Sequence, residues 1–253
     1  MALATCNYAG LNGFGRLLVK NILTLFLVST VFFVCLVFSW HILSKTNFFF
    51  NIIYDVHQVE SHINEFAPQN RQNRIDFELT SKDERVRIIG EILLAVNAKG
   101  VGLEAIQYFN RNGAAVNLFL TQAEVEHLED VGVLVQLMNR IALILILILI
   151  FIFFLAAKYK KTSPNLIMLV CSMVSLILVT TGIIIFIGPL VVFNKLHEWI
   201  FAEKSQWQFY YQDSLMTTLL KAPDTFASLA ILLTATTVVF WLSIFYFIKI
   251  ILK

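Results

Sequence analysis

The sequence predicts an all-α protein in which four transmembrane helices carry a helical cap on the extracytoplasmic side. Of its 253 residues, 58% are hydrophobic and 14% are charged, and the mean hydropathy is +0.76. A soluble domain is about half apolar and about a quarter charged. This composition indicates a protein that folds in a bilayer, and the positions of its apolar runs and charges predict its topology.

Four apolar stretches are long enough for a helix to cross the hydrocarbon core, which takes roughly 20 residues. They are residues 22–43, 141–157, 166–193 and 226–252. The second reads "IALILILILIFIFFLAA", and its alternation of Leu and Ile also suggests a strand, but a lone strand in lipid would leave its backbone groups unpaired. We therefore expect four helices within a single integral membrane domain, residues 1–253.

Charges are sorted between the connections, and this predicts the orientation. All 17 Asp and Glu residues lie within residues 44–140 and 194–225. The termini and the connection between the second and third runs contain basic residues and no acidic ones: Arg16, Lys20, Lys158, Lys160, Lys161, Lys249 and Lys253. Because Lys and Arg accumulate at the cytoplasmic ends of spans, we expect both termini in the cytoplasm and residues 44–140 and 194–225 outside.

Charge and cysteine content argue against several function classes. The formal net charge of +2 combines two populations on opposite sides of the membrane, so it gives no support to nucleic-acid binding. Cys6, Cys35 and Cys171 all lie outside the two predicted outer loops, which argues against disulfide-forming membrane oxidoreductases, tetraspanins and claudins. The sequence has no glycine-rich phosphate loop and gives no sign of an organic cofactor.

Two helix signatures in the first outer loop predict the cap. "SKDERVRIIGEILLAVNA" begins with Ser81 and Glu84 at the spacing of a capping box and continues with an apolar stripe. "TQAEVEHLEDVGVLVQLMNR" repeats the spacing with Thr121 and Glu124 and leads directly into the second apolar run. We therefore expect these segments to form helices on the outer membrane surface.

On the second of these helices, Glu124 and Asp130 lie about one turn on either side of His127. A carboxylate beside an imidazole fixes its tautomer and raises its pKa, which suits a general base. A solvated acidic face that happens to contain a histidine has the same spacing. Glu, His and Asp are also metal ligands, but no His-Glu-x-x-His spacing appears, and we assign no metal site.

The second outer loop contains the stretch "KLHEWIFAEKSQWQF". It places His197 just past the third apolar run, followed by Trp199 and Trp207, and Asp213 comes before the fourth run. Aromatic residues at this level commonly anchor a loop in the headgroup region. Taken alone, the loop is interpreted equally well as an anchor with an incidental histidine or as part of a functional site.

Several segments resemble the bacterial lipoprotein intramolecular transacylases: "EVEHLEDV" on the outer-loop helix, "FNKLHEWIF" at the third run, and "DSLMTTLLKAPDTF" before the fourth. The order of elements is also similar, with a large helical outer loop after the first span and a short aromatic one after the third. "NFFFNIIYDV", which contains Tyr54, resembles the family more loosely. The resemblance implies a catalytic pair, His127 and His197, with supporting residues Glu124, Asp130, Asp213, Trp199, Trp207 and Tyr54.

The resemblance implies an enzyme that moves the sn-2 acyl chain of a diacylglyceryl-modified N-terminal cysteine onto the α-amine of that cysteine, giving a lyso-form lipoprotein. It also implies that the partners are diacylated bacterial lipoproteins and membrane lipid. The implied location is the bacterial cytoplasmic membrane, with the active face outside. Two other hypotheses remain open: a metal-assisted membrane hydrolase and a non-catalytic scaffold or binding protein.

Overall fold

The computed structural model describes residues 13–158, 166–201 and 206–251. Among them are four helices long and apolar enough to cross a membrane, which confirms a largely helical chain with four candidate spans. These are α1 (Gly13–Lys45), α5 (Gln122–Lys158), α6 (Leu166–Ile187) and α9 (Asp224–Ile251). Of the residues used for the topology and cysteine predictions, Cys6, Lys160, Lys161 and Lys253 lie outside the described residues.

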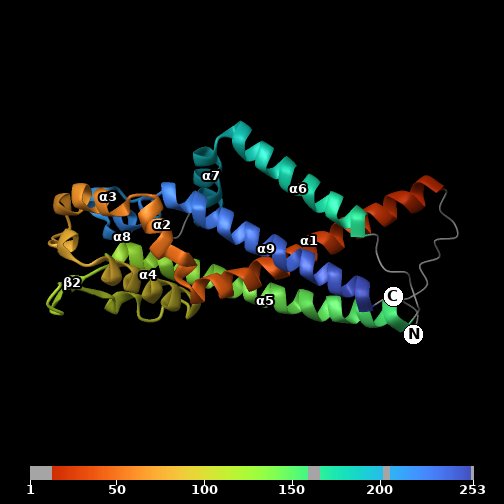
Figure 1. Cartoon of the computed structure of the whole chain (residues 1–253), viewed down its shortest axis with the longest axis horizontal. Coiled ribbons are helices and arrows are strands. Elements are labelled where there is room, and N and C mark those ends of the chain that lie inside the picture. Colours follow the sequence, from red (N-terminus) through yellow and green to blue (C-terminus); the bar gives the residue numbers. More distant parts are fainter. Residues whose placement is uncertain (1–12, 159–165, 202–205, 252–253) are drawn as a thin grey trace.

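The helix α1 contacts each of the three other long helices, α5, α6 and α9. It runs beside α5 and α9 along the long axis of the molecule, and α6 diverges from this group (Figure 1). Trp241 of α9 is fully buried, and its indole Nε1 donates to the carbonyl oxygen of Val28 at 3.3 Å. The apolar cluster around Trp241 includes Leu169 and Met173 from the first turns of α6. The buried residues that α6 adds to this cluster come from its first turns, and its later turns diverge from α1 and α9 (Figure 1).

The predicted third span, residues 166–193, is not one helix. The helix α6 ends at Ile187, Gly188 has a φ of +101°, and α7 (Pro189–Phe201) begins at the next residue. Glycine adopts this left-handed conformation readily at a helix end, and proline is favoured in the first turn of a helix. The chain therefore turns here, as Figure 1 shows. His197 consequently lies within a helix and not in a loop.

The second cap helix and the second span form one continuous helix, α5. Its first part contains all of its acidic residues, and the purely apolar run begins at Ile141. The predicted span, residues 141–157, is thus the C-terminal half of this helix. The part of α5 that carries Glu124, His127 and Asp130 packs with the cap helix α4 (Lys82–Asn97).

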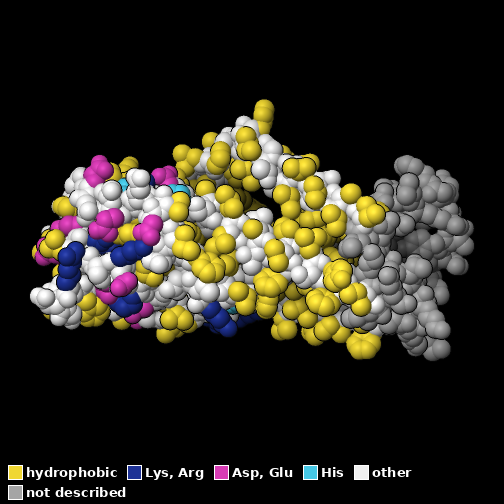
Figure 2. Space-filling model, viewed as in Figure 1, with side chains coloured by type: hydrophobic (Ala, Val, Ile, Leu, Met, Phe, Trp, Pro, Cys, Tyr) yellow, Lys and Arg dark blue, Asp and Glu magenta, His cyan; other side chains and the backbone are white. Residues whose placement is uncertain are grey.

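The cap gathers at one end of the long helices, and most of the charged side chains visible in Figure 2 lie there. Its α-helices are α2 (Phe50–Val56), α3 (Val59–Phe66), α4 (Lys82–Asn97) and α8 (Leu215–Leu220). Its short 3-10 helices are η2 (Asn47–Phe49), η3 (Ala67–Gln69), η4 (Phe77–Leu79), η5 (Leu103–Ala105) and η6 (Tyr211–Asp213). One apolar core joins α2, α3, α4 and α8 with η3, η4, η5 and the first turns of α5.

The predicted capping box of Thr121 and Glu124 is complete, whereas that of Ser81 and Glu84 is half formed, because the Glu84 carboxylate accepts from the backbone N–H of Phe109. The Ser81 hydroxyl accepts a hydrogen bond from the backbone N–H of Glu84 at 3.2 Å, which starts α4. The backbone N–H of Thr121 donates to the Glu124 carboxylate at 2.6 Å, and the backbone N–H of Glu124 donates to the Thr121 hydroxyl at 3.3 Å. These reciprocal bonds satisfy donors that a helix N-terminus otherwise leaves unpaired.

The all-α prediction missed a small hairpin in the cap. Strands β1 (Gln107–Phe109) and β2 (Ala115–Leu118) pair antiparallel. The turn between them is closed by Asn110, whose side-chain oxygen accepts from the backbone N–H groups of Asn112 and Ala114. The Asn112-Gly113 dipeptide is a hairpin signal that could have indicated this element.

Candidate active site

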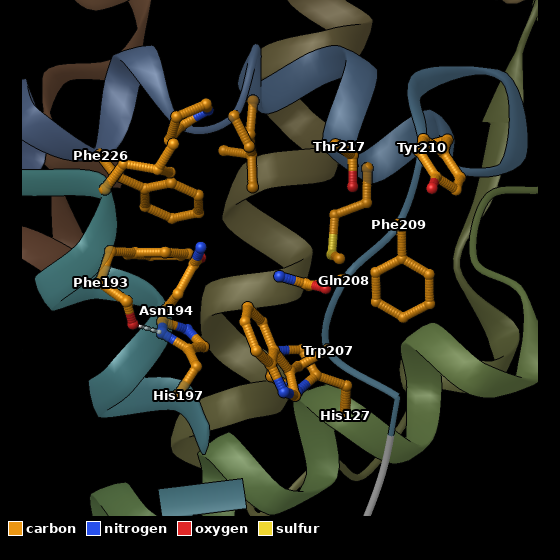
Figure 3. Close-up of a pocket in the computed structure, with 15 residues that line it drawn as sticks. His127, Phe193, Asn194, His197, Trp207, Gln208, Phe209, Tyr210, Thr217 and Phe226 are labelled. Carbon is orange, nitrogen blue, oxygen red and sulfur yellow. Dashed lines mark hydrogen bonds between the residues drawn. The ribbon is translucent and has the colours of Figure 1, made fainter. Parts of the chain in front are cut away.

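A cavity of about 460 Å³ lies where α7 meets the cap. Side chains from α5, α7, residues 206–210, α8 and the start of α9 converge on it (Figure 3). The lining residues are His127, Leu190, Phe193, Asn194, His197, Trp207, Gln208, Phe209, Tyr210, Met216, Thr217, Leu220, Ala222, Pro223 and Phe226. His127, His197 and Tyr210 are the ionisable side chains among these residues.

His127 enters the cavity from the second turn of α5. Its side chain is 8% exposed, and its Nδ1 atom is buried without a hydrogen-bond partner among the described residues. Burial lowers the pKa of His127 to about 4, with a further decrease from His197 and a smaller opposing effect from Asp130. The prediction that a neighbouring carboxylate raises this pKa is thus wrong, because desolvation of the charged ring outweighs the attraction of Asp130.

Glu124 does not contact His127. Its side chain is fully buried, and one carboxylate oxygen accepts the N–H of Thr121 while the other accepts the hydroxyl of Ser214 at 2.5 Å. Ser214 is the N-cap of α8. The carboxylate therefore ties the N-terminus of α5 to the N-terminus of α8, and so it fixes two walls of the cavity relative to each other.

His197 enters from α7 with a defined ring orientation. Its Nδ1 atom lies 2.9 Å from the carbonyl oxygen of Phe193, one turn earlier in the helix (Figure 3). A carbonyl only accepts hydrogen bonds, so Nδ1 carries the proton and the neutral ring keeps its lone pair on Nε2. The ring also packs against Phe193 and Trp207, with centroid distances of 4.0 and 4.9 Å.

The fold brings His127 and His197 together although they are far apart in the sequence. Their ring centroids are 6.4 Å apart. Phe201 contacts both rings, at 5.0 Å from His127 and 5.6 Å from His197. A substrate group in the cavity can therefore contact both imidazoles, and an apolar wall supports both rings.

Residues 22–226 match the family model of the lipoprotein intramolecular transacylase Lit. The chain belongs to this family. The matched segment includes both histidines and all the residues that line the cavity of this transacylase-family protein. Neither a curated protein nor a solved structure matched the chain.

In this member of the transacylase family, the other sequence-predicted site residues are dispersed. Trp207 lines the cavity, but Trp199 is 82% exposed and does not line it. Asp213 binds Arg71 with an N–O distance of 2.6 Å on the surface. Tyr54 donates to Glu60 and accepts from the buried Arg85 in the cap core. Asp130 is a half-buried residue of α5 that acts on His127 through its charge, without lining the cavity.

Polar cavity residues that the sequence reasoning missed are Asn194, Gln208 and Thr217. Asn194 is three residues before His197, and this spacing places both on one face of α7. That spacing could have identified Asn194 once α7 was recognised as a helix. Gln208 follows Trp207 in an extended segment, and Thr217 lies on the short helix α8. No comparable periodicity marked these two positions.

The residues that the structure describes give no support for a metal site in this transacylase-family protein. No three His, Cys, Asp or Glu side chains gather there as metal ligands would. The cavity lining includes two such residues, His127 and His197, and the nearest carboxylates are engaged elsewhere or lie outside the lining. The metal-assisted hydrolase therefore gains no specific observation in its favour.

Proposed function

We propose that this protein transfers the sn-2 acyl chain of a diacylglyceryl-modified N-terminal cysteine to the α-amine of the same cysteine, which gives a lyso-form lipoprotein. The observation that carries this proposal is the pairing of His127 and His197 in one cavity beside the ends of the apolar helices. Membership of the transacylase family supports the same reaction class. In the proposed topology the cavity would lie just outside the hydrocarbon core, where the ester groups of membrane lipids are found.

The proposed location is the bacterial cytoplasmic membrane, with the cap and the histidine cavity on the extracytoplasmic face. The sorting of charges supports this orientation, because acidic residues are confined to residues 44–140 and 194–225. The diacylglyceryl chains of the substrate would lie in the outer leaflet. The modified cysteine would then reach the cavity at the membrane surface without leaving the bilayer.

In the proposed mechanism, His197 is the general base. An α-amine has a pKa near 8 and is largely protonated at neutral pH, so it must lose a proton before it attacks an ester. Because Nδ1 of His197 donates to the Phe193 carbonyl, Nε2 is the ring nitrogen that can accept this proton. The bond to Phe193 also holds the ring in one tautomer during the reaction.

His127 would stabilise the negative charge that develops on the ester carbonyl oxygen. Its lowered pKa keeps the ring neutral at neutral pH. A neutral imidazole retains one N–H, and it can donate that hydrogen to a developing oxyanion, as a neutral catalytic histidine does in other enzymes. The two histidines therefore take different roles because one is buried and the other is bonded to a backbone carbonyl.

The bonds in this reaction balance without water or a second substrate. The amine nitrogen bonds to the acyl carbon, the ester carbon–oxygen bond breaks, and the proton held on His197 passes to the departing glycerol oxygen. The second proton that the nitrogen loses as it becomes an amide is released to solvent. Donor and acceptor belong to one molecule, so holding them together raises their effective concentration greatly. An acyl-enzyme is not required in this scheme, because the amine attacks the ester directly.

Mass spectrometry of lipoprotein N-terminal peptides from cells with and without this protein tests the proposal. The wild type is expected to give N-acyl, S-monoacylglyceryl cysteine, and His127→Ala and His197→Ala variants present at equal membrane levels are expected to give none. Identical lipoproteins in all strains would contradict the transacylase function. Product formed by both variants would instead contradict the assigned histidine roles.

A further inference from the structure

A second cavity, of about 410 Å³, adjoins the histidine cavity. It lies between the cap helix α4 and the cap-proximal parts of α1, α5 and α9. Four residues line both cavities: Phe193, Met216, Leu220 and Phe226. The two spaces are therefore neighbours that share part of their walls, and we call the second one the apolar chamber.

The lining of the apolar chamber is suited to hydrocarbon. Asn47 is the only lining residue with a polar side chain apart from Trp40, and the Trp40 indole N–H already donates to the Asn97 side chain at 3.0 Å. Ile92, Leu93 and the other lining residues contribute aliphatic or aromatic surface. A polar ligand would lose its hydrogen bonds to water there without replacement, so the chemistry of the walls selects an apolar ligand.

We propose that the apolar chamber binds the tail of the acyl chain that is transferred, a role that rests on the proposed function. Phe193 supplies both the carbonyl that orients His197 and a ring that lines both cavities. An ester carbonyl placed beside the His197 ring therefore has Phe193 next to it, and the attached chain can pass Phe193 into the chamber. The acyl chain that remains on the glycerol, and the peptide, lie outside the apolar chamber.

This arrangement makes the chamber a determinant of acyl-chain length. Ala230 on α9 is the smallest side chain in the lining, and it does not line the histidine cavity. A phenylalanine at this position would occupy space that a long chain needs while leaving the histidines untouched. Ala235, also exposed on α9 but outside the chamber lining, offers a matched control for the same substitution in the same helix.

The first test measures transfer by the full chain in lipid nanodiscs, using diacylated lipopeptides whose sn-2 chain is either palmitoyl or octanoyl. Wild type and Ala235→Phe are expected to transfer both chains. Ala230→Phe is expected to lose at least roughly ten-fold in palmitoyl transfer relative to octanoyl transfer, because the added ring would take up space in the chamber that only the longer chain needs. An equal effect on both chains, or no effect in a folded variant, would overturn the role of the chamber.

The second test needs binding but no turnover, and it uses the wild-type chain alone. A lipopeptide with a diazirine at the end of its sn-2 chain is photolysed with the protein, and the labelled peptides are mapped. Label in α4, at Ile92 or Leu93, is expected, because α4 belongs to the cap and a chain lying in the bilayer would not reach it. Label confined to lipid-facing residues of the spans would overturn the proposal.

Together the two tests separate this inference from the proposed function. Labelled α4 without any product in the wild type would support chain binding in the chamber and contradict the transacylase reaction. Product without label in α4 would support the reaction and overturn the chamber. A misfolded Ala230→Phe variant leaves the photolabelling of the wild type to decide.

Discussion

The Nδ1 atom of His197 donates to the carbonyl oxygen of Phe193 at 2.9 Å, within α7. This bond assigns the proton to Nδ1 and leaves Nε2 as the basic atom of the neutral ring. The buried Nδ1 of His127, whose ring centroid lies 6.4 Å from that of His197, has no hydrogen-bond partner among the residues that the structure describes. The two histidines therefore differ in environment, and this difference leads to separate predictions for each.

Replacing His197 with asparagine tests the role of its free nitrogen. The shorter amide can still donate to the Phe193 carbonyl, but it has no basic atom at the position of Nε2. General-base catalysis contributes roughly 100-fold or more, so we expect a loss of that size in the transfer rate with little change in thermal stability. Glu198→Gln, on the exposed neighbouring residue, is the control and should retain activity.

The buried His127 predicts a pH-dependent stability. Its pKa is lowered from 6.5 to about 4, so between these values the unfolded chain binds the proton more readily than the folded chain. Stability therefore rises with pH through this window and is lost as the pH falls from 6.5 to 4. A shift of this size corresponds to roughly 3 kcal/mol.

Thermal unfolding of wild type and His127→Asn in detergent between these pH values measures this contribution. The carboxylates that the two proteins share contribute equally, so the difference between the two curves reports on His127. The wild type is expected to lose more stability than the variant as the pH falls. Parallel curves would show that His127 is not buried in its neutral form.

Glu124 should behave as a structural residue and not as a partner of His127. Glu124→Ala leaves the Ser214 hydroxyl and the Thr121 N–H without their buried acceptor, which costs about 2 kcal/mol or more. Glu124→Gln keeps an acceptor at this helix position and should cost less. Melting temperatures with matched activity assays test this. Loss of activity in Glu124→Gln at unchanged stability would instead indicate a direct catalytic role.

Substitutions at Trp199 and Trp207 should differ in their effect on the transfer rate. Trp207 packs on His197 at 4.9 Å and lines the cavity, whereas Trp199 is 82% exposed. We expect Trp207→Ala to lower the transfer rate roughly ten-fold, because a loosened catalytic ring costs about 1.4 kcal/mol or more. Trp199→Ala should retain the rate. Equal effects of the two substitutions would mean that both act only as membrane anchors.

Local patterns in the sequence predicted local structure well. Thr121 and Glu124 form both capping bonds that their spacing indicated, and Ser81 and Glu84 form one of the two, because a capping box closes within four residues. The candidate spans also followed from apolar length alone. The break at Gly188 was hidden because the residues around it are as apolar as the span itself, although the Gly-Pro pair is a recognised signal for a turn.

The geometry of the site could not be predicted in the same way. The spacing of Glu124 and His127 suggested a contact, but the carboxylate turns toward Ser214, which is supplied by a distant part of the chain. The proximity of His127 to His197 depends on the turn between α6 and α7, which redirects the chain toward the cap. Burial, which dominates the pKa of His127, likewise arises only from tertiary packing.

The most direct test of the account is a crossover experiment with the purified full chain and two synthetic diacylated lipopeptides. One carries a deuterated sn-2 chain on a light peptide, and the other an unlabelled chain on a heavy peptide. Because the reaction is an isomerisation, tandem mass spectrometry must locate the chain within the product. The account predicts deuterated chains on the amine of light peptides only, and a transfer rate roughly 100-fold lower for His197→Asn. Deuterated chains on heavy peptides, or released as free acid, would contradict intramolecular transfer.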